Sequence, residues 1–147
     1  MTRLADAIEA ARVAATAPPR EGHARDLVLE ILRAASEDER VKHNLEDVPK
    51  GRALLRFTDT DEAIEFEAGD GIIKAEAAEP KGKGPKVDAT SATWLGLVSG
   101  TLRPWLAFTR GMVVARAGLT ELRWLQQVAE RLQQAYKDEH AEKKDST

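Results

Sequence analysis

Three histidines are the side chains in this sequence best suited to bind a metal ion or to transfer a proton near neutral pH. His23, His43 and His140 lie far apart in the chain, and none is followed by a second histidine at the spacing of a metal site. The chain has no cysteine, which excludes disulfides, thiolate nucleophiles and cysteine-bound metals. The sequence therefore predicts no metal site.

The acidic residues and glycines form no known catalytic motif. Asp59, Asp61 and Glu62 are clustered, but the glycine and the distal glutamate of a calcium loop are missing, so we interpret the cluster as a hairpin tip. No phosphate-binding glycine loop, nucleophile elbow or histidine pair occurs. We expect a protein that is not an enzyme and that needs no cofactor.

Lysines gather in one short segment of the chain. Lys81, Lys83 and Lys86 lie within residues 81–86, which contain two glycines, a proline and no acidic residue. Such a loop could contact the phosphates of an anionic membrane. The alternative is an ordinary solvated loop, and the sequence leaves both interpretations open.

The apolar segment 91–119 says more about function than any charged residue. Its pattern predicts two short helices, the first ending at Gly100 and the second beginning at Pro104 and ending at Gly111, followed by a strand over 112–117. An apolar unit of this kind is typical of a site for a lipid-like ligand or a protein partner.

Composition and charge limit the class of protein, its partners and its location in the cell. With 147 residues the chain corresponds to one domain, and 42% hydrophobic and 32% charged residues are typical of a globular protein. A net charge of −3, without a basic stripe, predicts no nucleic-acid partner. Asp6, Glu9 and Arg12 interrupt the apolar stretch that a signal peptide needs, so we expect a cytoplasmic protein.

Hydrophobic periodicity divides the chain into an arm, a domain and a tail. Residues 1–19 are predicted to form a helical arm that ends at Pro18-Pro19 and is dispensable for folding, and residues 138–147 a disordered polar tail. The domain, 20–137, is an α+β unit. An apolar period of 3.6 predicts helices and a period of 2 predicts strands, and the first four strands are expected to be of antiparallel type. The predicted helices span 23–35, 38–45, 93–99, 104–110 and 120–137. The predicted strands span 52–58, 64–68, 72–77, 86–90 and 112–117.

Within this order of elements, the segment 94–111 resembles the sterol carrier protein type 2 domain. The family pattern places glycine, leucine, proline, Ala-Phe and a closing glycine in the register of Gly100, Leu102, Pro104, Ala107-Phe108 and Gly111. The resemblance covers roughly residues 22–136. It implies a five-stranded twisted sheet with helices packed on one face, and a hydrophobic tunnel between them that binds or carries a fatty acyl, sterol-like or isoprenoid lipid without chemistry.

Small residues on the strands suggest where such a tunnel would lie. Ala75, Ala77, Ala89, Ala115 and Ala117 share the inward parity of their strands, whereas the large apolar residues come from the helices. This pattern predicts either a volume that a lipid tail fills or a close approach of the helices to the sheet. On the first interpretation the candidate lining residues are Leu27, Ile31, Ala75, Ala89, Trp94, Leu97, Val98, Leu102, Trp105, Phe108, Ala115, Leu122 and Leu125.

Two further apolar features leave the choice of partner open. Trp105 and Trp124 could close the mouth of a tunnel, cover a partner or lie in the core. Met112 and Val114 have the outward parity of the last strand and predict an apolar patch that a homodimer or the arm could cover. The sequence thus favours a lipid-binding protein; the alternative is an accessory or dimerisation module with a filled core.

Overall fold

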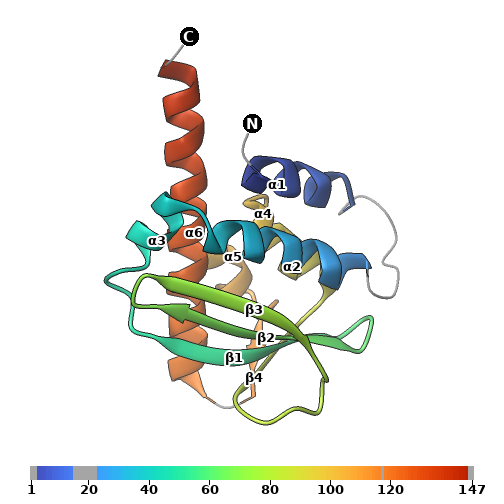
Figure 1. The fold of residues 1–147 in the computed structure, drawn as a ribbon. Helices are drawn as coiled ribbons and strands as arrows, with labels where there is room; N and C mark the ends of the chain where they lie inside the picture. The colour runs from blue at the N-terminus through green and yellow to red at the C-terminus, as the bar shows by residue number, and fades with distance from the viewer. Residues whose placement is uncertain (1–2, 15–22, 117, 146–147) are drawn as a thin grey trace.

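The computed structural model describes residues 3–14, 23–116 and 118–145, which form six helices and five strands (Figure 1). The helices are α1 (Arg3–Ala14), α2 (His23–Ser36), α3 (Glu39–Asn44), α4 (Ser91–Ser99), α5 (Pro104–Thr109) and α6 (Leu119–Asp145). The strands are β1 (Gly51–Phe57), β2 (Glu62–Gly69), β3 (Ile72–Ala78), β4 (Lys86–Ala89) and β5 (Val114–Ala115). No helix in these ranges is both long enough and apolar enough to cross a membrane.

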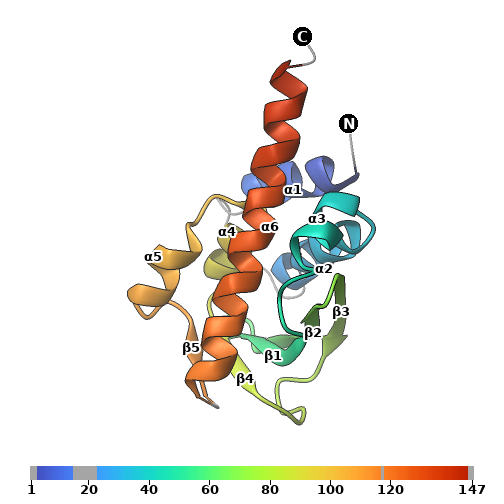
Figure 2. The same cartoon turned by 90° about the vertical axis from the view of Figure 1, so that its left-hand side faces the viewer.

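The five strands form one sheet in the order β3-β2-β1-β4-β5. The helices pack on one face of it, as Figures 1 and 2 show, and this confirms the expected α+β architecture. One expectation is wrong: β4 pairs with β1 in parallel. The alternation of apolar and polar residues is the same for either direction of a strand. The connection from β3 crosses β2 and β1, and β4 then adds to the far edge of β1 in the direction of β1.

Alternation along β1 and β2 separates a core face from a charged face. Leu55 pairs with Ile64 and Ala53 with Phe66, and all four side chains are buried under the helices. The opposite parity is mainly charged, although it also carries the buried Leu54, and Lys50 just before β1 lies 3.1 Å from Glu67. A slip of one residue would exchange the two faces, so burial fixes the register.

The predicted arm is α1, and it is packed on the domain. Leu4, Ala7 and Ile8 are buried in the main core cluster, where α1 contacts α2 and α4. Burial of a leucine or isoleucine stabilises a fold by about 1.5–3 kcal/mol, less the entropy lost in ordering the helix. The boundary between arm and domain near residue 19 remains a prediction.

Deleting residues 1–19 should leave a folded remainder of lower stability. We expect the free energy of unfolding to fall by about 2 kcal/mol, because the deletion exposes the parts of α2 and α4 that Leu4 and Ile8 cover. Urea unfolding of the full chain and the deletion variant measures the difference, and Leu4→Ala provides a milder control. Unchanged stability, or a remainder that does not fold, would contradict this prediction.

The last helix is longer than predicted. α6 continues to Asp145, whereas a helix ending at 137 and a disordered tail were expected. Residues 119–145 contain no glycine or proline, and Gln134 donates a hydrogen bond to Asp138 over 3.0 Å at the helical spacing of four. The polar composition of this segment therefore does not end the helix, and Figure 1 shows the C-terminal part of α6 extending beyond the body.

The last strand is shorter than predicted, covering two residues where 112–117 was expected. The N–H of Met112 donates to the carbonyl of Ala107 over 3.0 Å, so this residue closes the end of α5 and does not join the sheet. Met112 and Val114 are both exposed, as their parity predicted, and Ala117 lies outside the described residues.

Candidate functional site

An apolar cavity of about 30 Å³ lies between the sheet and the helices. It is bounded by α2, β1, β2, α4 and α6, and every side chain that lines it is apolar. The lining residues are Leu32, Leu55, Phe66, Trp94, Leu97, Val98, Leu125, Val128, Ala129 and Leu132. A cavity of this kind has no group that could do chemistry, and it can hold only an apolar part of a ligand.

Trp94 presents its apolar surface to the cavity because its polar atom is bound elsewhere. The indole N–H donates to the carbonyl of Arg56 on β1 over 2.9 Å. Its ring lies beside that of Phe57, with centroids 6.3 Å apart. The hydrogen bond fixes the position of the ring, since an unpaired buried N–H would be costly.

Gln133 joins α4 to α6 next to the cavity. Its side-chain amide donates to the carbonyl of Leu97 over 2.9 Å and to that of Leu102 over 2.8 Å. Leu102 packs directly on Gly96, where an added Cβ would lie 2.8 Å from the Cβ of Leu102. The end of α4 and the turn after it are thereby held against α6.

Replacing Gln133 by leucine should lower the free energy of unfolding by about 2 kcal/mol, because one buried and one partly buried carbonyl lose their donor. Gln134→Leu is the matched control. Gln134 is exposed and donates to the side chain of Asp138, so its replacement should change stability by less than about 0.5 kcal/mol. Chemical denaturation of both variants measures the effects, and equal losses would contradict the role given to Gln133.

The structure brings only part of the predicted tunnel lining to the cavity. Trp94, Leu97, Val98 and Leu125 line it. The other candidates lie elsewhere: Ile31, Ala75, Ala89 and Phe108 are buried outside the lining, Leu27, Leu102, Ala115 and Leu122 are partly buried, and Trp105 is exposed. That the predicted residues bind lipid remains a prediction.

The alanines of the strands do not create the cavity. α2 packs along β3, the strand of Ala75, and Ala77 is exposed at the end of that strand. Neither Ala75 nor Ala89 lines the cavity. The small residue that does line it, Ala129, belongs to α6. At β3, alanine therefore permits a helix to approach the sheet closely, which was the alternative interpretation.

Six lining residues were not among the candidates. Leu55 and Phe66 have the inward parity of β1 and β2, and that parity alone could have indicated them. The other four belong to the apolar stripes of α2 and α6. Such a stripe shows which side of a helix is buried, but not which part of it faces an empty volume. These four residues are Leu32, Val128, Ala129 and Leu132.

Trp124 covers one end of the sheet beside the cavity. Its indole N–H donates to the carbonyl of Ala68 over 3.1 Å, and its ring lies 5.8 Å from that of Phe66. An added Cβ on Gly51 would come within 2.5 Å of the Trp124 ring, so the glycine leaves room for the indole. Of the three interpretations open for Trp124, packing against the core describes its position.

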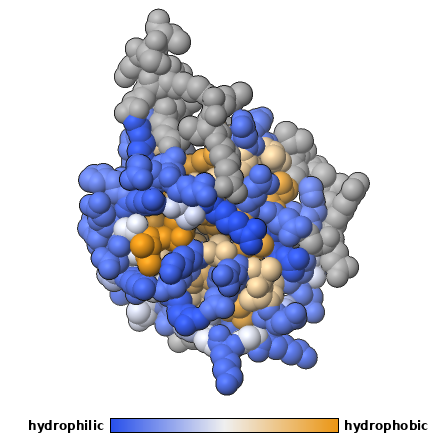
Figure 3. All heavy atoms as spheres, viewed as in Figure 1, coloured by the Kyte–Doolittle hydropathy of each residue, from blue (hydrophilic) through white to orange (hydrophobic). Residues whose placement is uncertain are grey.

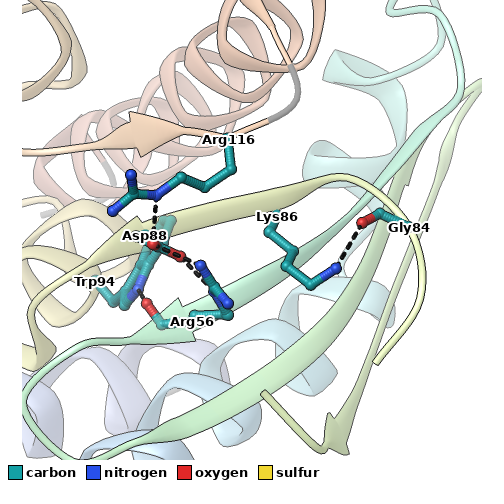
Figure 4. Close-up of polar contacts among 6 residues, drawn as sticks. All are labelled: Arg56, Gly84, Lys86, Asp88, Trp94 and Arg116. Carbon is teal, nitrogen blue, oxygen red and sulfur yellow. Dashed lines mark hydrogen bonds and ion pairs between the residues drawn. The ribbon is translucent and has the colours of Figure 1, made fainter. Parts of the chain in front are cut away.

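A polar cluster on the other face of the sheet is centred on Asp88 (Figure 4). Arg56 donates to both carboxylate oxygens, Nε to Oδ1 over 2.5 Å and Nη2 to Oδ2 over 2.8 Å. Arg116 Nε donates to Oδ2 over 3.0 Å. The hydrogen bonds from Arg56, ahead of the opposing effect of burial, hold the pKa of Asp88 below its ordinary value.

The carboxylate at the centre of the cluster is fully engaged in ion pairs. Both oxygens of Asp88 are engaged by guanidinium groups, so the carboxylate is neither a free base nor a free metal ligand. Arg56 connects this face to the cavity, because its backbone carbonyl accepts the indole N–H of Trp94. The ion pairs with Asp88 therefore fix the position of Arg56 on β1, and the backbone carbonyl of Arg56 in turn orients the indole of Trp94 in the cavity.

Solved structures similar to this one carry sterol carrier names. A Thermus thermophilus protein described as possibly a sterol carrier protein gives a TM-score of 0.54 at 20% identity over 74% of this chain and 82% of that one. Sterol carrier protein 2 gives 0.53 at 19% identity, covering 92% and 94%. UbiJ-SCP2, a ubiquinone synthesis protein, gives 0.53 at 8% identity, covering 82% and 97%.

These similarities show the fold, and they confirm the resemblance indicated by the segment 94–111. A scan of family models and a search of curated protein sequences find no match to this chain. Its fold is that of the sterol carrier protein 2 domain.

Proposed function

We propose that this chain, which has the fold of sterol carrier protein 2, binds and carries a lipid by its apolar tail without changing it chemically. The observation that carries the proposal is the cavity between helices and sheet, whose lining contains no charged or hydrogen-bonding side chain except the engaged indole of Trp94. Burial of the tail would supply most of the affinity, at about 0.8 kcal/mol for each CH₂ group.

Binding requires the cavity to open. Ligand pockets commonly enclose about 300–1,000 Å³, whereas this cavity encloses about 30 Å³. A movement of α6 or α4 away from β1 and β2 would enlarge the volume enough for an acyl chain, since these helices supply most of the lining. We infer that the cavity marks the place where the two layers separate around a ligand. A location in the cytoplasm is part of the same proposal.

Native mass spectrometry of the freshly purified protein tests the proposal. We expect excess mass that organic solvent removes, and saturable binding of a long-chain fatty acid to the emptied protein. Trp94 lies in the lining and should report binding through its fluorescence, with Trp105→Phe reducing the signal from an exposed tryptophan. A protein that carries no lipid, and that binds none after exposure to mixed lipids, would contradict the proposal.

The small volume of the cavity favours a second candidate function. A filled core would suit an accessory or dimerisation module, and one protein of similar fold is a ubiquinone synthesis protein. The two candidates differ in their response to ligand. A carrier gains thermal stability when a fatty acid is added, because the ligand binds only the native state, whereas a filled module does not.

A further inference from the structure

The exposed large hydrophobic side chains among the described residues all fall within 105–119. Trp105 on α5 is 61% exposed and Leu119 at the start of α6 is 67% exposed, with Met112 at 39% and Val114 at 41% between them. Helix α6 contacts both α5 and β5, and Figure 2 shows the three elements together at the edge of the sheet opposite β3. The face that Figure 3 shows is mainly hydrophilic, with some apolar patches between the polar residues.

Arginines lie between these apolar residues in the sequence. The segment 101–124 contains four arginines and one acidic residue, Glu121, so it carries a formal charge of +3 in a chain whose net charge is −3. Arg103, Arg110 and Arg123 are exposed and form no ion pair with another described residue, and Arg116 is 63% exposed at the rim of the Asp88 cluster. We call the four apolar and four arginine residues the α5–β5 edge.

We propose that the α5–β5 edge docks the protein on a bilayer that contains anionic phospholipid. Arginine pairs with phosphate through two parallel N–H donors, and tryptophan with aliphatic side chains favours the interface between headgroups and tails. The remainder of the chain carries net negative charge, so such a membrane attracts this edge and repels the other faces.

A protein partner fits this composition less well. The centre of a protein interface is depleted of charge, whereas here arginines alternate along the chain with the apolar residues. The lysine loop of residues 81–86 is a weaker candidate for the same membrane, because Lys81 and Lys83 are exposed without a large apolar side chain beside them in sequence.

The docking proposal deepens the proposed function, since a lipid carrier must load and unload at a membrane. The contact would be brief and salt-dependent, because screening weakens the attraction between exposed charges. Docking would also bring α5 and the start of α6 to the bilayer. Because α6 contributes four of the cavity-lining residues, the helix next to the bilayer is also one that lines the cavity.

Sedimentation with vesicles tests the docking surface. We expect binding to vesicles of phosphatidylcholine with phosphatidylglycerol, little binding to phosphatidylcholine alone, and release by salt. The triple variant Arg103→Gln, Arg110→Gln and Arg123→Gln should bind at least about tenfold more weakly, since each basic residue near an anionic surface contributes roughly fivefold. The matched control Lys81→Gln, Lys83→Gln and Lys86→Gln removes the same charge and should bind like the parent.

Quenching of tryptophan fluorescence measures whether the apolar residues insert into the bilayer. Brominated lipids should quench part of the tryptophan fluorescence, and Trp105→Phe should remove that part. Leu119→Ser changes an exposed residue at the first position of α6 and should weaken vesicle binding while leaving the fold intact. Equal vesicle binding by the arginine variant and its lysine control would overturn the proposal, as would a dimer that Leu119→Ser dissociates.

Fatty-acid binding in solution separates this proposal from the carrier function. The arginine variant should bind a fatty acid as the parent does, because its altered residues do not line the cavity. Vesicle binding without fatty-acid binding would support the docking surface and contradict the carrier. Fatty-acid binding without vesicle binding would support the carrier and overturn the docking surface.

Discussion

Replacing Ala129 by phenylalanine should lower the affinity for a long-chain fatty acid by at least about 100-fold. Ala129 is the smallest residue of the cavity lining and lies on α6, facing the volume that a lipid tail would enter. A phenylalanine ring in that place would exclude several CH₂ groups of the tail, and each excluded group costs about 0.8 kcal/mol of binding. Titration followed by tryptophan fluorescence or by calorimetry measures the loss.

Two controls separate blockage from damage to the fold. Ala135→Phe enlarges a fully buried alanine of the same helix outside the cavity lining, so it should destabilise the protein without blocking the ligand. Leu132→Ala enlarges the cavity and should preserve binding while costing about 2–4 kcal/mol of stability. Loss of affinity in Ala135→Phe alone, or retention of affinity in Ala129→Phe, would sink the assignment of the cavity as the lipid site.

The second large effect should come from Asp88→Ala, which we expect to lower the free energy of unfolding by about 3 kcal/mol at neutral pH. Asp88 is 6% exposed and accepts hydrogen bonds from two arginines. Removing the acid leaves the partly buried Arg56 without its partner, and breaking a fully buried pair by removing one member costs roughly 3–5 kcal/mol. We take the lower end because Arg56 keeps some access to water.

This effect should depend on pH in a stated direction. The pKa of Asp88 is lowered in the folded protein, so the carboxylate contributes stability that is fully present above its unfolded pKa of about 3.9. The contribution is lost as the pH falls through the lower pKa of the folded state. Urea unfolding of the parent and of Asp88→Ala should therefore converge in acid and differ most near neutral pH.

Arg116→Gln provides the matched comparison. Its side chain is 63% exposed, and removing it leaves the two hydrogen bonds from Arg56 in place. A surface ion pair contributes about 0–1 kcal/mol, so we expect a loss within that range. Equal losses for Arg116→Gln and Asp88→Ala would show that burial of the pair with Arg56 is not the source of the stability.

Local sequence determined the type and order of most elements. The ends of α4 and α5 follow from single residues: Gly100 adopts a left-handed conformation with φ of 86° after α4, and Pro104 begins α5 at the first position. The core face of β1 and β2 follows from alternation alone. These features depend on interactions within a few residues, so the printed order of amino acids is sufficient to predict them.

The tertiary structure alone decided where the cavity lies. Its lining comes from five elements distant in the chain, and the sequence identified four members, whereas other candidates such as Ala75 and Ala89 lie outside the lining. The parallel pairing of β4 with β1 and the bonds of Gln133 to α4 also join distant segments. An apolar residue shows that it will be buried, but an empty volume depends on how closely whole helices approach the sheet, and that is set by the packing of all their side chains together.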